Sequence, residues 1–168
     1  MPVLPLRIHH DGLLSVVAPL GAASSVGTAV VVDLAPNAPP LRGERTVADL
    51  VDEGPSADDL RPRQGRVAVL PLGAADPAEA GPVIEALART WPFVVLRTET
   101  GSAVDVAPLF GPDTPAWVHQ PTGFVPVPKG LTGIVLPSLP VRTVRALLAG
   151  RTAGGRWVAS WQRVWRSL

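Results

Sequence analysis

Three charged side chains stand at or just beyond the ends of apolar runs that are typical of buried strands. Asp33 follows the valines of residues 30–32 and leads into the proline-rich turn "LAPNAPP", while Arg97 and Glu99 close the run "FVVLRTE". Open α/β sheets bind ligands at the carboxyl ends of their strands. Acids in that position often serve magnesium-dependent phosphate chemistry. One interpretation is therefore a small-ligand-binding or enzymatic α/β domain with a pocket around Asp33, Arg97 and Glu99.

The chain lacks the other groups that catalysis requires. It has no cysteine, which excludes disulfides, thiolate metal sites and cysteine nucleophiles. The neighbouring His9 and His10 are a poor basis for a zinc site. No G-x-S-x-G nucleophile motif is present, and Ser24 and Ser25 have no histidine nearby in the sequence. We therefore expect neither a cofactor nor a metal, and we predict that the protein is not an enzyme.

Short apolar runs separated by turn residues predict the strands that position these side chains. Most runs are apolar on both alternating faces, which is typical of strands covered by helices on both sides. The predicted strands are residues 13–20, 28–35, 66–73, 93–99, 123–127 and 133–138.

Helix signals lie between and after these runs. Residues 46–53 begin with Thr46 as a plausible N-cap, and residues 76–91 begin with an aspartate followed by proline. Residues 140–150 and 155–168 predict two more helices. Alternating strands and helices indicate an α/β fold, and a chain of 168 residues suits one domain. We predict a single layered domain over residues 1–168, with a mostly parallel central sheet flanked by helices.

The order "VVVDLAPNAPP … TVADLVDEG … VAVLPLG … WPFVVLRTETG" resembles the MinD/ParA-like family of P-loop ATPases over about residues 13–101. Members of that family run strand, glycine-rich phosphate loop, helix, and a strand that ends in an aspartate. A short helix, a strand, a helix and a further strand follow. The resemblance implies a P-loop-NTPase-like fold.

This chain departs from the family's pattern where nucleotide binds. The matching place for the phosphate loop, residues 21–28, has five residues between its glycines and no lysine. The family's magnesium-linked acid falls on Arg97. Only seven residues separate the predicted strands 13–20 and 28–35, where the family has a helix. The resemblance therefore implies a truncated pseudo-ATPase. Because septum-site and pilus-assembly relatives position other machinery, we expect a non-catalytic scaffold or regulatory protein that acts through protein–protein contact.

The C-terminal helix, residues 155–168, is amphipathic. It carries three tryptophans on one arc and three arginines outside that arc: Trp157, Trp161, Trp165, Arg156, Arg163 and Arg166. A tryptophan face suits three roles, namely packing on the protein's own sheet, docking on a partner, or lying in a membrane interface. Packing within the fold is the first expectation, because the last helix of an α/β fold covers a sheet face; the family resemblance adds support to the membrane role, since MinD-like proteins use a basic amphipathic C-terminal helix there. These six residues are the partner-binding candidates.

Charge is divided unevenly along the chain. Residues 1–113 carry eight basic and fourteen acidic side chains, whereas residues 114–168 carry seven basic side chains and no acid. Either the two parts attract each other within the fold, or the basic part meets an anionic partner. An unidentified protein is the partner we expect first, with a homo-oligomer, a membrane surface or nucleic acid as alternatives.

One uncharged stretch is long enough on paper to span a bilayer. It runs from residue 12 to residue 32, but Pro19, Gly21 and Gly27 interrupt it and Asp11 precedes it. Neither feature suits a membrane span or a signal peptide. We expect a cytoplasmic protein.

Overall fold

The computed structural model describes residues 2–9, 12–62, 65–109, 123–127 and 133–168. A six-stranded sheet forms its centre, in the order β3-β2-β4-β1-β5-β6. Among the pairings of these strands in the described residues, that of β6 with β5 is antiparallel and the others are parallel. The α/β prediction with a mostly parallel sheet is therefore confirmed. The strands are β1 (Val3–Ile8), β2 (Val30–Leu34), β3 (Ala68–Leu70), β4 (Val94–Thr98), β5 (Val104–Leu109) and β6 (Gly123–Val127).

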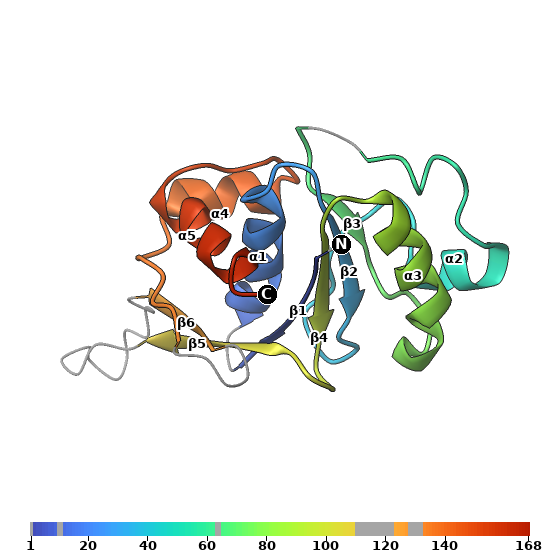
Figure 1. Ribbon diagram of the computed structural model, residues 1–168, viewed down its shortest axis with the longest axis horizontal. Coiled ribbons are helices and arrows are strands. Elements are labelled where there is room, and N and C mark those ends of the chain that lie inside the picture. Colours follow the sequence, from blue (N-terminus) through green and yellow to red (C-terminus); the bar gives the residue numbers. More distant parts are fainter. Residues whose placement is uncertain (1, 10–11, 63–64, 110–122, 128–132) are drawn as a thin grey trace.

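Helices cover both faces of the sheet (Figure 1). One layer holds α1 (Gly12–Ser24), α4 (Val141–Leu148) and α5 (Arg156–Trp165). The opposite layer holds α2 (Val47–Glu53), the 3-10 helix η1 (Pro77–Ala80) and α3 (Gly81–Thr90). Alternate residues of β2 and β4 face opposite layers, so Val31 packs in the first core and Val30 in the second. The valines on both faces of these two strands are buried, since helices cover both sides there.

The structure corrects the predicted strand at residues 13–20, which lie within helix α1. This helix is enclosed between the sheet and α4 and α5, so it is apolar all round and has no polar stripe that would mark its period. The first strand is instead β1, which the prediction missed. Helix α1 therefore provides the crossover between β1 and β2, and the predicted short connection between two strands was wrong.

Most of the remaining elements follow their local signals. Thr46 caps α2 in a full capping box with Asp49. The predicted helix 76–91 begins as η1 and continues as α3 from Gly81. Residues 133–138 form no named strand, although the amide of Leu136 donates to the carbonyl of Phe124 beside the β6 edge.

Candidate functional site

Asp33 and Arg97 lie side by side on neighbouring strands. They are register partners between β2 and β4, and both are buried, at 3% and 1% exposure. Arg97 Nε donates to Asp33 Oδ1 at 2.8 Å, and Nη2 donates to Oδ2. The guanidinium thus meets the carboxylate through two parallel hydrogen bonds, the geometry in which an arginine binds a carboxylate best.

The third nitrogen of Arg97 joins the pair to two further segments. Nη1 donates to the carbonyl of Pro39 at 2.8 Å and to that of Ser15 at 3.2 Å. Pro19 lies four residues after Ser15 in α1 and has no N–H, so it cannot use the Ser15 carbonyl as a helix would. Arg97 therefore donates to a carbonyl that has no helical N–H partner because of the proline. Its hydrogen bonds connect β4 with β2, with α1 and with the loop after β2.

This arrangement closes the carboxyl edge of the sheet at the place where a ligand pocket was predicted. Asp33 Oδ1 also accepts from the amide of Ala35 at 3.1 Å, so the buried carboxylate is well satisfied within the chain. The half-buried Glu99 is engaged separately, because its carboxylate accepts from the amide and the side chain of Asn37 at 3.1 and 2.9 Å. The predicted pocket around Asp33, Arg97 and Glu99 is therefore corrected: two of the three residues neutralise each other, and the third binds a loop.

The candidate phosphate loop at residues 21–28 lies elsewhere. It comprises the last turn of α1 and the link that enters β2 at its amino end, so it is at the opposite edge of the sheet from Asp33. The link that leaves β1 at the same edge as Asp33 begins at His9. Residues 10 and 11 are outside the described residues.

A second polar cluster, which was not predicted from the sequence, lies at β1 and β5. Arg7 Nε donates to Asp105 Oδ1 at 2.7 Å, and His9 Nε2 lies 2.8 Å from the same oxygen. The hydrogen bond from Arg7 holds the pKa of Asp105 below its usual value, with a smaller contribution from His9 in the same direction. The cluster is partly exposed. Each of the two strands carries one charged residue between apolar neighbours, Arg7 in β1 and Asp105 in β5, and this pattern does not specify a partner.

The three tryptophans of α5 face the protein's own core. Trp157, Trp161 and Trp165 are 1%, 0% and 8% exposed. Trp157 lies against α1 so closely that a Cβ on Gly21 would stand 2.2 Å from its Cζ3 atom. Trp165 Nε1 donates to the carbonyl of Ala22 at 3.0 Å. The interpretation of these tryptophans as partner-binding residues is therefore wrong; the alternative, packing within the fold, is the one observed.

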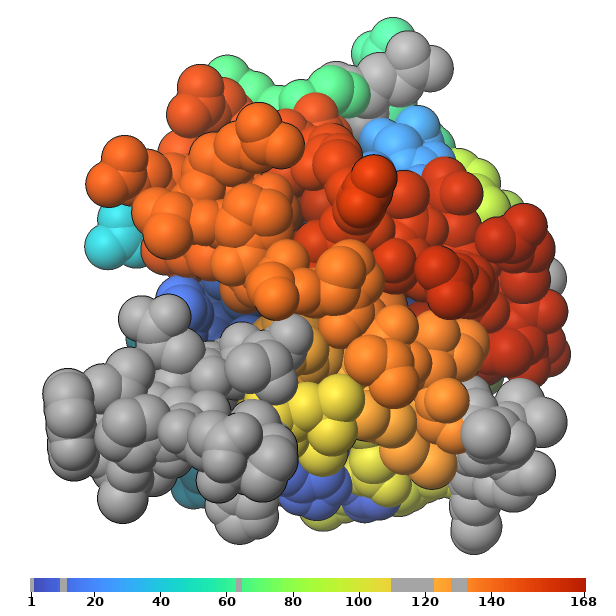
Figure 2. Space-filling model, turned by 90° about the vertical axis from the view of Figure 1, so that its left-hand side faces the viewer, coloured from blue at the N-terminus to red at the C-terminus, as the bar shows by residue number. Residues whose placement is uncertain are grey.

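The arginines of the same region remain on the surface. Six described arginines follow residue 140 and all are exposed: Arg142, Arg145, Arg151, Arg156, Arg163 and Arg166. Within the described residues, every ion pair joins side chains of the first 113 residues, and none reaches these six. The interpretation that the two parts of the chain neutralise each other is not supported there. The C-terminal segment that carries these arginines spreads over the upper part of the face in Figure 2.

No family model, curated protein or solved structure matches this chain. Among the residues described, no group of three histidine or acidic side chains is placed to hold a metal ion. Likewise, none of the helices in that part of the chain combines the length and apolar character of a membrane span. The closed Asp33–Arg97 pair and the unpaired basic surface are therefore the features on which a functional proposal rests.

Proposed function

We propose that this protein is a non-catalytic relative of the MinD/ParA-like ATPases that acts as a scaffold or regulator through contact with another protein. The observation that carries the proposal is the buried pair of Arg97 with Asp33. By the resemblance, Arg97 stands where the family has an acid linked to magnesium. The positive charge of Arg97 would repel a magnesium ion, and its two hydrogen bonds occupy both oxygens of the Asp33 carboxylate.

The order of elements supports the same proposal. With α1 as a helix, the chain runs strand, link, helix and then a strand that ends near Asp33, and α2, β3, α3 and β4 follow. This is the order described for the family. The link between β1 and α1 would then correspond to the phosphate loop, and its sequence, residues 9–11, is "HHD" without a lysine. A phosphate loop needs glycine amides and a lysine to neutralise phosphates.

The surface that suits a partner is the arginine-rich outer side of α4 and α5. It includes Arg156, Arg163 and Arg166, which were predicted as partner-binding residues. Helix α4 also exposes Val141 and Leu148, at 66% and 50%. Unpaired arginines beside exposed apolar side chains favour a protein partner that presents acidic groups around an apolar contact.

A thermal-shift titration with ATP and ADP, each with and without magnesium, tests the non-catalytic part. We expect no magnesium-dependent change in melting temperature at millimolar nucleotide. A true nucleotide site would stabilise the fold by about 2.7 kcal/mol at roughly 100 times its dissociation constant. A shift that requires magnesium would contradict the proposal.

The partner surface is tested by charge reversal. The triple variant carries Arg156→Glu, Arg163→Glu and Arg166→Glu. Partner proteins that co-purify with the wild-type chain from its own cells should no longer co-purify with this variant. Arg61→Glu is the matched control, because Arg61 is also exposed but precedes α3, outside the α4 and α5 surface. Equal recovery with the triple variant and the wild type would refute the assignment of this surface.

A further inference from the structure

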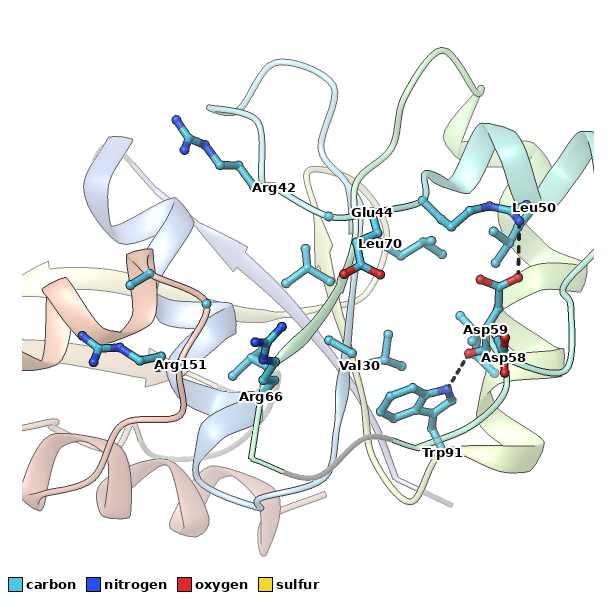
Figure 3. A pocket seen from close by; sticks show the side chains of 18 residues that line it. Val30, Arg42, Glu44, Leu50, Asp58, Asp59, Arg66, Leu70, Trp91 and Arg151 are labelled. Carbon is cyan, nitrogen blue, oxygen red and sulfur yellow. Dashed lines mark hydrogen bonds and ion pairs between the residues drawn. The ribbon is translucent and has the colours of Figure 1, made fainter.

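A cavity of about 610 Å³ lies beside β3 at the edge of the sheet, away from the Asp33–Arg97 pair (Figure 3). Its walls come from β3, the loop of residues 42–45, residues 58–59 and the segment 149–151 after α4. Small-molecule sites usually measure about 300–1,000 Å³ and combine an apolar lining with a few polar groups. We propose that this cavity binds a small organic anion, a ligand with an apolar body and one anionic head group such as a carboxylate or phosphate.

The inner lining of the cavity is apolar. It consists of side chains that belong to the core between the sheet and the α2 and α3 layer: Val30, Leu50, Leu70, Leu87 and Trp91. The Trp91 indole N–H donates to the carbonyl of Asp59 at 3.1 Å, which fixes the orientation of the ring. A ligand body placed here would cover apolar surface and contact a rigid aromatic side chain.

Three arginines with no bonded partner gather on one side of the cavity. Arg66 and Arg151 are direct partners in an antiparallel bridge, and Arg42 comes from the loop after β2. Within the described part of the chain, none of the three side chains makes a hydrogen bond or an ion pair. Their guanidinium groups are spread along this side in Figure 3, so together they make it positively charged. An anionic head group here would be attracted by these charges and could accept hydrogen bonds from a planar guanidinium group.

The opposite wall is acidic but partly neutralised. Arg45 Nη2 lies 2.7 Å from Glu53 Oε2, and Arg45 Nη1 lies 3.8 Å from Asp59 Oδ2. The negative charge of Asp59 is therefore partly compensated by Arg45. In Figure 3, Arg42, Arg66 and Arg151 lie on one side of the cavity and Asp58 and Asp59 lie on the other, with the carboxylate of Glu44 between the two groups. This separation orients a ligand, with the head group toward the arginines and the body toward Trp91.

The loop that forms the upper wall is held tightly against the sheet. A Cβ on Gly43 would stand 2.3 Å from the carbonyl oxygen of Val69, so only glycine allows this approach. This close approach fixes the position of the loop that forms one wall of the cavity.

The test uses two fluorescent probes with the same aromatic body. The first, 1-anilinonaphthalene-8-sulfonate, carries an anionic group, and the second, N-phenyl-1-naphthylamine, lacks it. We expect the sulfonate to bind at least tenfold more tightly than the neutral probe. The double variant Arg66→Gln/Arg151→Gln should raise the dissociation constant of the sulfonate by about tenfold or more, because one hydrogen bond to a charged group contributes that much to affinity. The affinity for the neutral probe should change little.

The matched control is Arg142→Gln/Arg145→Gln, which removes two exposed, unpaired arginines from α4 and should leave both affinities unchanged. Ala68→Phe, which fills the cavity from β3, should abolish binding of both probes. Circular dichroism and urea unfolding establish that each variant is folded. Equal affinities for the two probes, or equal losses in the two arginine double variants, would overturn the proposal. These outcomes do not depend on magnesium or on the proposed protein partner.

Discussion

Replacing Arg97 by methionine tests whether the buried pair stabilises the fold as its geometry indicates. The substitution keeps an unbranched side chain of similar length but removes all the donors. Asp33 would then be a carboxylate at 3% exposure whose nearest remaining donor is the amide of Ala35. The carbonyls of Ser15 and Pro39 would also lose their donor from Arg97.

The expected loss follows from the cost of an uncompensated buried charge. Removing one partner of a buried ion pair typically costs about 3–5 kcal/mol, a large part of the 5–15 kcal/mol that holds a domain together. The double variant Asp33→Leu/Arg97→Met leaves the same two carbonyls without the guanidinium but removes the charge. It should therefore recover about 2–3 kcal/mol of the loss, because the difference between the two variants is the unpaired carboxylate.

Equilibrium urea unfolding at neutral pH measures both variants, with fluorescence of the buried Trp157 and Trp161 as the signal. A loss below about 1 kcal/mol in Arg97→Met would show that Asp33 does not depend on the guanidinium. A double variant less stable than the single one would show that the carboxylate has another role. Either result would also remove the main support for the proposal that the Arg97–Asp33 pair occupies the place of a metal site and makes the protein non-catalytic.

Three further predictions concern packing, capping and pH. Gly21→Ala should cost about 1–3 kcal/mol in urea unfolding, because its Cβ would stand 2.2 Å from the Trp157 ring, and Trp157→Phe should offset part of that loss in the double variant. Thr46→Ala should lower stability by about 1 kcal/mol through loss of the α2 cap, whereas Thr46→Ser should be nearly neutral; equal losses would contradict the capping role. The pKa of Asp105 is lowered in the folded state, chiefly by Arg7, so its contribution is present above the ordinary aspartate pKa of about 3.9 and is lost as pH falls through the lowered value. Asp105→Asn should therefore reduce the fall in the free energy of unfolding at acid pH. An unchanged fall would contradict a stabilising role for the Arg7–Asp105 pair.

Local signals in the sequence predicted much of the fold. Runs that are apolar on both faces became β2, β3 and β4 because helices cover the sheet twice. Thr46 and Asp49 marked the start of α2 through a capping box that involves only four consecutive residues. The periodic tryptophans marked the apolar face of α5, although they did not show that this face packs on the protein's own core. Each of these features depends on near neighbours in the chain, so each can be recognised without knowing the rest of the fold.

Local patterns were thus enough for β2, β3, β4, β6 and the helices other than α1, but they missed β1 and β5 and they could not indicate which side chains meet. The helix at residues 13–20 was predicted as a strand because the segment is enclosed between the sheet and two helices, and a run that is apolar all round has no periodicity that separates helix from strand. Arg97 closes the strand end because the register of β2 with β4 places Asp33, 64 residues earlier, beside it. Arg66 and Arg151 face each other only through a bridge between distant segments. Contacts of this kind depend on strand register and helix packing, which are properties of the whole chain and not of any short stretch of it.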